Sequence, residues 1–332
     1  MQKALQWLVS RYLILAAIAP LIGMGCTDNL SSNQPVENPD VPALRRTRER
    51  QGTAYYNTSA LSSSKNNLPK LTIGVLSTQT LTEQEQMIQP LDEYLEQSLG
   101  RKVDFLIAKN YQEIENLLLQ NKLDLAYLGT VTYLEAVEKG AKIQPLATAI
   151  DKHTGQPWYR ACIIVKANSS IKTLKDLKGK RVAFVDKLSA SGYLMPLVSL
   201  KKLGINPEQD FAEVIYAGTH SKSMTALEDG IVDAAATNVS YYFKQQKNGQ
   251  ITPEKYRLIW ESAPIPNFPI VVSEKLSPEL IQQLKQVFVA SPDGIEDILG
   301  AESAGYTLVS PDDYTPIQQL RQELNLISIP KK

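Results

Sequence analysis

The sequence contains few cysteines and histidines, and it carries no net charge. It has two cysteines and two histidines among 332 residues, with 35 basic and 35 acidic side chains. Because there is no basic excess to neutralise phosphates, the chain does not have the profile of a nucleic-acid-binding protein. His153 and His220 are far apart and have no cysteine or acidic partners at ligand spacing. We therefore expect no metal site, and nothing in the pattern implies a cofactor.

The two cysteines have different surroundings. Cys26 directly follows residues 1–25, in which Lys3 and Arg11 precede an apolar stretch ending at small residues. This pattern is typical of an export signal, and its apolar run is short for a membrane span. We expect Cys26 to be the lipidated N-terminus of a lipoprotein held in the periplasm at the membrane; conventional cleavage and an uncleaved anchor are the alternatives. Cys162, in the apolar run ACIIV, is interpreted as core packing, because a single remaining cysteine cannot form an internal disulfide.

Apolar periodicity is absent between the signal and about residue 70. Polar stretches such as SSNQPVENPD and NTSALSSSKNN occupy this part of the chain. We interpret residues 26–70 as the lipidated cysteine followed by a disordered tether. The whole chain is 43% hydrophobic and 21% charged, the profile of a soluble globular protein long enough for two domains.

From Leu71 on, short apolar strands alternate with helical segments. Strand-like runs such as KLTIGVLS, KVDFLIA and LDLAYLG are each followed by an amphipathic segment, and the second half repeats this alternation. The pattern predicts an α/β fold with parallel βαβ units. Extended crossings near 155–160 and 260–266 predict two bodies with a ligand cleft between them. The expected lobes are residues 71–157 plus 264–325 for the first and 158–263 for the second.

Small hydroxyl residues follow one strand at a predicted helix start. In DKLSASGYLMP, Ser189 or Ser191 can cap a helix that runs to Leu203. The first-turn N–H groups of a helix lack internal partners and carry partial positive charge, so the same segment can instead hold an anion. Both interpretations fit the spacing. Pro196 lacks an N–H group, so it predicts either an irregular first turn or a later start of the regular helix.

Two further segments share this design. AYLGTVTYL turns at Gly129 and can start a helix at Thr130, and YAGTHSKSM turns at Gly218 before His220. A lone histidine is usually incidental, whereas one beside hydroxyls at a helix start can contribute to a binding site. His153, in the polar stretch DKHTGQ, is interpreted as a solvated loop residue.

Four segments together resemble the phosphonate/phosphite/phosphate-binding periplasmic solute-binding proteins of bacterial ABC importers. They are DLAYLGTVTYLEA, SIKTLKDLKGKRVAFVDKLSASGYLMP, AGTHSKSMTALEDGIVDAAATN and IPNFPIVVSEKLSPEL. Their order and spacing fit this family from about residue 71 to residue 325. The resemblance implies a two-lobed, type II-like periplasmic-binding-protein fold whose cleft closes on an oxyanion about a two-crossing hinge. It also implies an ABC permease and an ATPase as partners, and we expect a monomer.

The resemblance also assigns site residues. The S-T-S motif of the family falls on Ser189, Ala190 and Ser191, so alanine replaces the usual threonine and only its backbone N–H remains as a donor. The cleft histidine of the family falls on His220, and its first-lobe tyrosine falls on Tyr127. Asp233, before AATN, completes the residues carried over. The full set of expected ligand-binding residues is Ser77, Thr78, Tyr127, Gly129, Thr130, Ser189, Ala190, Ser191, Gly192, His220 and Asp233.

Asp233 decides between classes of ligand. It would repel a dianion unless it accepted a proton from a P–OH group or paired with a ligand amine; the alternative is an aspartate that caps a turn. Because no acidic cluster accompanies it, we expect a small oxyanion such as phosphite, phosphate or an alkylphosphonate rather than an aminoalkylphosphonate.

The expected function is therefore capture of a small phosphorus oxyanion for an ABC importer. A periplasmic sensor and a binder of another anion, such as a sulfonate, are alternatives with the same fold. A Ser/His/Asp hydrolase is a third alternative, but the G-x-S-x-G motif is absent and no orienting partner for the histidine is evident, so we expect no enzyme.

Overall fold

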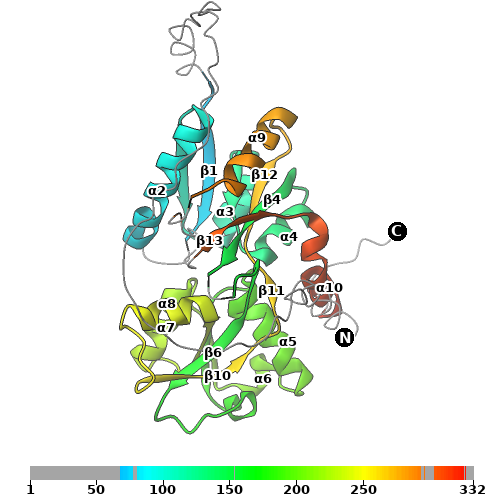
Figure 1. Cartoon of the computed structure of the whole chain (residues 1–332). Coiled ribbons are helices and arrows are strands. Elements are labelled where there is room, and N and C mark those ends of the chain that lie inside the picture. The colour runs from blue at the N-terminus through cyan, green and yellow to red at the C-terminus, as the bar shows by residue number, and fades with distance from the viewer. Residues whose placement is uncertain are drawn as a thin grey trace, which may run out of the picture.

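The computed structural model describes residues 68–77, 81–152, 154–292, 295, 303–324 and 326. The predicted export signal, Cys26, most of the tether, Thr78 and His153 lie outside these residues. Figure 1 shows two α/β bodies joined by extended segments, with the C-terminal helix beside their junction.

The first lobe is built on a six-stranded sheet with the strand order β13-β4-β12-β3-β1-β2. Its strands are β1 (Leu71–Leu76), β2 (Val103–Ala108), β3 (Leu125–Tyr127), β4 (Ile143–Asp151), β12 (Pro269–Ser273) and β13 (Ser303–Leu308). Its helices are α2 (Leu81–Leu99), α3 (Tyr111–Leu119), α4 (Thr130–Glu138), α9 (Pro278–Val289), the 3-10 helix η5 (Pro311–Tyr314) and α10 (Thr315–Glu323). β1 pairs in parallel with β2 and β3, whereas β12 and β13 are antiparallel to their neighbours.

The second lobe is built on a five-stranded sheet with the order β10-β6-β9-β7-β8. Its strands are β6 (Ala161–Lys166), β7 (Arg181–Phe184), β8 (Glu213–Tyr216), β9 (Ala234–Asn238) and β10 (Tyr256–Glu261). Its helices are the 3-10 helix η3 (Leu174–Leu177), the π-helix η4 (Ala190–Leu194), α5 (Met195–Lys202), α6 (Pro207–Asp210), α7 (His220–Glu228) and α8 (Val239–Lys247). β7 is parallel to β8 and β9, and β6 is antiparallel to β9 and β10.

Two short strands lie where the chain crosses between the lobes. β5 (Trp158–Tyr159) and β11 (Ile265–Pro266) pair antiparallel. The predicted two-lobed α/β fold with two crossings is confirmed, but the sheets are mixed rather than purely parallel. The physical reason is the second crossing: β12 starts beside the junction and runs away from it, whereas β1 and β3 run toward it. We propose the lobe boundaries given above, because both crossings fall within this small sheet.

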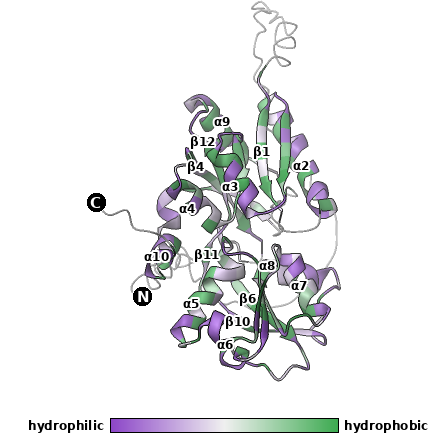
Figure 2. Ribbon diagram, turned by 180° about the vertical axis from the view of Figure 1, so that it is seen from behind, coloured by the Kyte–Doolittle hydropathy of each residue, from purple (hydrophilic) through white to green (hydrophobic). Residues whose placement is uncertain are grey.

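Apolar faces hold each lobe together. α2 buries Ile88, Leu91, Leu95 and Leu99, which repeat at helical spacing, and each buried leucine contributes about 1.5–3 kcal/mol. Figure 2 shows the hydrophobic strands inside each body and the hydrophilic faces of the helices outside. Cys162 is a fully buried free thiol, as core packing requires. Among the described helices, none combines the length and the apolar character needed to cross a bilayer.

The two lobes are in contact. Val185, Ala190 and Leu194 of the second lobe belong to the same buried apolar cluster as Leu128 and Val131 of the first. Burial of these side chains between the lobes removes apolar surface from water, so the contact stabilises a closed arrangement.

Candidate functional site

Most of the predicted site residues that the structure describes lie where strands of both lobes end against each other. In the first lobe Val75 is paired with Tyr127, so the residues that follow, Ser77 and Gly129, lie at the same sheet edge. The side chain of Thr132 in α4 donates a hydrogen bond to the carbonyl oxygen of Leu188 in the second lobe at 3.4 Å. In open α/β sheets, ligands bind outside the carboxyl ends of the parallel strands.

The SASG segment forms an irregular helical start. Ser189 caps the π-helix η4, and its Oγ accepts a hydrogen bond from the N–H of Gly192 at 3.0 Å. The N–H of Leu194 reaches back five residues to the carbonyl of Ser189 at 3.1 Å. Pro196 has no N–H for the carbonyl of Gly192, which accepts from Val185 instead at 3.0 Å. The predicted irregular first turn is confirmed; π-turns are frequent at functional sites.

Gly192 is required by close packing at this turn. A Cβ placed there would lie 2.3 Å from Cγ2 of Val185 and 2.9 Å from Oγ of Ser189. Val185 is fully buried and β-branched, so it has little room to move aside. The glycine therefore allows strand β7 and the serine turn to approach each other.

Ser191 presents a buried polar group that has no hydrogen-bond partner among the described residues. Its side chain is 1% exposed, and its Oγ makes no hydrogen bond within the described part of the chain. A buried hydroxyl without a partner costs free energy that a hydrogen-bonding ligand would recover. The neighbouring Ala190 is also buried and contributes its methyl group to the interlobe apolar cluster.

His220 is a buried neutral imidazole at the start of α7. Its cap is Thr219, whose side chain accepts from the N–H of Lys222 at 3.1 Å. The ring Nδ1 lies 2.9 Å from Oγ1 of Thr237 at the end of β9. Burial lowers the pKa of His220 to about 4, so the ring is uncharged at neutral pH. Depending on its tautomer, Nε2 of a neutral ring can donate to an oxyanion or accept from a protonated one.

The first lobe contributes an aromatic residue and an open helix end. Tyr127 is 1% exposed at the end of β3, with its ring edge-to-face against Phe288. The cap of α4 is Gly129, which has no side chain with which to cap the helix. The hydroxyl of Thr130 donates to the carbonyl of Pro266 at 3.0 Å, which ties α4 to the second crossing. The side chain of Thr130 therefore binds the second crossing, and only the backbone of Thr130 lies at the open end of α4.

Asp233 lies at the other end of the second-lobe sheet. Its carboxylate accepts from the backbone N–H of Arg181 at 2.9 Å and pairs with the Arg181 guanidinium at 2.8 Å. These hydrogen bonds lower the pKa of Asp233, and its side chain is 33% exposed. β7 and β9 are parallel, and Arg181 and Asp233 lie at their starts. Ser189 follows the end of β7, and Thr237 lies near the end of β9. Asp233 therefore stabilises the strand starts, about 10 Å along β7 from the serine turn.

Three further residues take part that the sequence did not single out. Tyr111 begins α3 and is buried, and its ring lies beside Gly129, where an added Cβ would be 3.6 Å from the ring and 3.8 Å from the carbonyl oxygen of Leu188 in the second lobe. Thr132 and Thr237 make the contacts to Leu188 and His220 described above. Tyr111 had a readable signal, because it follows the carboxyl end of β2 at a helix start, as Thr130 follows the end of β3.

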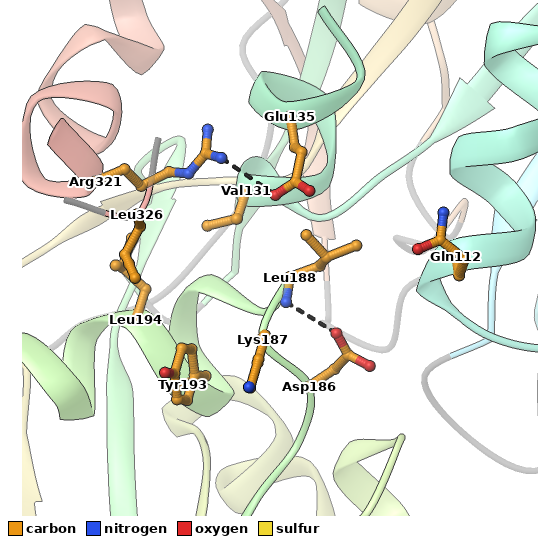
Figure 3. A pocket seen from close by; sticks show the side chains of 10 residues that line it. All are labelled: Gln112, Val131, Glu135, Asp186, Lys187, Leu188, Tyr193, Leu194, Arg321 and Leu326. Carbon is orange, nitrogen blue, oxygen red and sulfur yellow. Dashed lines mark hydrogen bonds and ion pairs between the residues drawn. The ribbon is translucent and has the colours of Figure 1, made fainter. Parts of the chain in front are cut away.

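A cavity of about 430 Å³ opens beside this region, and none of its lining residues belongs to the expected ligand-binding set. Figure 3 shows Glu135 and Arg321 of the first lobe facing Asp186 and Tyr193 of the second. Arg321 pairs with Glu135 at 3.2 Å, and Asp186 accepts from the N–H of Leu188 at 2.8 Å. These charges are therefore already paired or hydrogen-bonded within the protein.

Comparison with known proteins gives consistent matches. Residues 73–314 match the family model described as "ABC transporter, phosphonate, periplasmic substrate-binding protein". The phosphate-import protein PhnD of Mycolicibacterium smegmatis is 30% identical over 66% of this chain and 70% of its own length. The phosphonates-binding periplasmic protein of Escherichia coli is 30% identical over 62% of each chain, so the aligned part is just under two thirds of that relative.

Solved structures share the fold. PhnD1 from Prochlorococcus marinus, in complex with methylphosphonate, superimposes with a TM-score of 0.70 at 20% identity, covering 78% of this chain and 99% of that one. A phosphonate transporter binding protein from Pseudomonas aeruginosa also gives a TM-score of 0.70, at 24% identity, covering 77% and 87%. The matching family model and the two curated relatives describe transport proteins that bind substrates, not enzymes. The chain therefore belongs to the periplasmic phosphonate substrate-binding proteins of ABC transporters.

Proposed function

We propose that this protein captures a small phosphorus oxyanion, such as phosphate, phosphite or an alkylphosphonate, between its lobes and delivers it to an ABC permease with its ATPase. The observation that carries the proposal is the buried Oγ of Ser191, which has no hydrogen-bond partner in the described chain. It belongs to a helical turn whose neighbouring residue, Leu188, accepts a hydrogen bond from Thr132 of the other lobe.

The donor set suits an oxyanion. Ser189 and Ser191 supply hydroxyls, the start of η4 supplies backbone N–H groups, and His220 supplies a neutral imidazole. Hydrogen bonds from neutral donors to a charged ligand are strong where water is excluded. Tyr127, buried at the facing strand end, is proposed to complete the site from the first lobe.

The position of Asp233 bears on ligand size. It was the only carboxylate proposed to meet a ligand amine, and it lies at the far end of the sheet in an ion pair with Arg181. This favours a small oxyanion over an aminoalkylphosphonate. The relatives named above for import of phosphate and for binding of phosphonates support the same class of ligand.

We also propose that the protein is a monomer anchored in the periplasm by lipid on Cys26. The proposal rests on the signal-like residues 1–25 and on the polar segment that follows them. Fractionation of cells checks the anchor: Cys26→Ala is expected to move the protein from the membrane to the soluble fraction. Recovery of both proteins in the soluble fraction would contradict it.

Calorimetry with a panel of anions tests the function directly. The purified protein is titrated with phosphate, phosphite, hypophosphite, methylphosphonate, 2-aminoethylphosphonate, methanesulfonate and sulfate. We expect one of the small phosphorus oxyanions to bind most tightly. Tightest binding of 2-aminoethylphosphonate, or of either sulfur oxyanion, would contradict the proposed ligand class.

A further inference from the structure

A buried hydrogen bond joins the two lobes in addition to the contact of Thr132 with Leu188. The hydroxyl of Ser240 in α8 donates to Oδ2 of Asp151, the last residue of β4, at 2.7 Å, and both residues are buried. β4 belongs to the first-lobe sheet, whereas α8 follows β9 of the second-lobe sheet. A hydroxyl that donates to a carboxylate forms a short and strong hydrogen bond. Because its partners belong to different lobes, this bond depends on how the lobes lie against each other.

The first lobe holds the Asp151 carboxylate ready for this contact. The backbone N–H of Asp151 donates to the carbonyl of Gln156 at 2.9 Å, and its Oδ1 accepts from the N–H of Thr154 at 2.9 Å. One carboxylate oxygen is thus fixed by the turn that follows β4, and the other meets the first turn of α8. Ser240 is the second residue of that helix, where the partial positive charge of the helix N-terminus favours a negative side chain.

α8 presents one face to each lobe. Tyr241 and Tyr242 lie in a buried apolar cluster of the second lobe. Lys244 comes one helical turn after Ser240 and so lies on the same side of the helix, where its Nζ is 3.6 Å from Sδ of Met87 in α2. Figure 1 shows α8 on the side of the second body that faces the first. Two contacts, one turn apart, therefore fix α8 against the first lobe.

The start of α8 is also connected to His220. Thr237, whose Oγ1 lies 2.9 Å from Nδ1 of His220, is followed by Asn238, the last residue of β9 and the cap of α8. Oδ1 of Asn238 accepts from the N–H of Tyr241 at 2.7 Å, which fixes the turn between the strand and the helix. Ser240 lies within this capped turn. A contact that holds Ser240 therefore also limits the movement of Thr237 and of the imidazole that it bonds.

We propose that Asp151 is a positioning residue that holds the imidazole of His220 in place for the bound oxyanion when the lobes close. This inference rests on the proposed function. Asp151 acts through Ser240 and the end of β9, and it needs no contact with the ligand. Because its bond to Ser240 requires the lobes to be in contact, the imidazole is restrained in the closed arrangement and released from this restraint in an open one. Affinity is thereby coupled to closure.

A double-mutant cycle tests the proposal. Affinities and dissociation rates for inorganic phosphate and methylphosphonate are measured for the wild type, Ser240→Ala, Thr237→Val and the double variant. Ser240→Ala removes the hydroxyl that bonds Asp151, and we expect it to weaken binding about five- to tenfold, mainly through faster dissociation. Thr237→Val keeps the shape of the side chain and removes its bond to His220. In that background Ser240→Ala is expected to cost less than about twofold, because the end of β9 then no longer holds the imidazole.

Ser223→Ala is the matched control. The Ser223 hydroxyl is also buried, but it donates to the carbonyl of Ala236 in β9 at 3.0 Å, within the second lobe. This variant is expected to lower the melting temperature without changing affinity. Wild-type affinity in Ser240→Ala, an equal loss in both backgrounds of the cycle, or an equal loss in Ser223→Ala would overturn the role of Asp151 while leaving the proposed function intact. A wild type that binds neither anion would overturn the proposed function and this inference with it.

Discussion

Polar side chains at the two ends of the second-lobe sheet have different surroundings. At the start of the parallel strands, Asp233 and Arg181 form a half-exposed ion pair in which each charge has its partner. At the other end, Ser191 and His220 are almost fully buried, uncharged, and only partly satisfied by the protein. The sheet therefore has one end at which charged side chains pair in contact with solvent, which we call the paired end. At the other end polar side chains are buried, and we call it the dry end.

The difference indicates which end is built for a ligand. An exposed ion pair contributes little to stability and needs nothing more. A buried hydroxyl without a partner costs free energy in the empty protein, and proteins retain such groups where another molecule satisfies them. The dry end also has neutral donors, so it can accept an anion without first displacing an internal counter-ion.

The largest expected effect is that of Ser191→Ala on affinity. Loss of one hydroxyl that bonds a buried charged ligand is expected to weaken binding by about 1.5–3 kcal/mol, or roughly ten- to a hundredfold. The melting temperature of the ligand-free protein should stay the same or rise, because the variant removes an unsatisfied buried group. Calorimetry and thermal unfolding measure the two quantities.

Ser273→Ala is the control for this prediction. Ser273 is also buried, but it ends β12 in the first lobe and accepts from the N–H of Lys275 at 3.4 Å. It is expected to leave affinity unchanged. If Ser191→Ala bound the oxyanion with wild-type affinity, the proposal that the dry end of the sheet binds the ligand would be wrong.

A smaller effect is expected from the titration of His220. Its pKa is lowered by burial from 6.5 to about 4, so between these values the unfolded chain binds more protons than the folded one. Stability is therefore unaffected above pH 6.5 and falls as the pH drops below it, by about 1.4 kcal/mol for each pH unit. From pH 7 to pH 5, the wild type is expected to lose about 1–2 kcal/mol more than His220→Gln in urea unfolding.

The comparison with His220→Gln isolates this residue, because all carboxylates are common to both proteins. A parallel pH dependence in the two proteins would show that the imidazole is accessible to protons in the folded state. The dry end would then be open to water, and its contrast with the paired end would be lost.

Local patterns in the sequence predicted most of the fold. Apolar runs separated by capped amphipathic segments predicted the strands and helices, and Pro196 predicted the irregular turn that became η4. The antiparallel direction of β12 and the strand β13 were not predicted, because strand direction depends on where the chain re-enters the sheet. No local pattern records that path.

The site could be predicted only where a residue's role depends on its own segment. Ser189 and Gly192 form one turn, and their spacing carries that information. Thr132 becomes a partner of Leu188 only when two lobes meet, although 56 positions separate them in the sequence. The place of Asp233 could not be predicted for a related reason: it is close in sequence to Thr237, but the length of β9 separates a strand start from a strand end.

The smallest expected effect is that of Asp233→Asn. The variant removes the ion pair with Arg181, but both side chains are exposed by a third or more, so we expect a loss of stability below about 1 kcal/mol. Arg181 lowers the pKa of Asp233 from 3.8, so this contribution is present above pH 3.8 and is lost as the pH falls through the lowered value. Urea unfolding at neutral and acidic pH measures this contribution. Asp210→Asn, which removes the exposed pair with Lys178, is a control of similar size.

The affinity of Asp233→Asn for phosphate and methylphosphonate is expected to stay within about twofold of the wild type, because no ligand at the serine turn reaches the strand starts. A tenfold loss of affinity would return Asp233 to the ligand site and would mean that the two ends of the sheet act together.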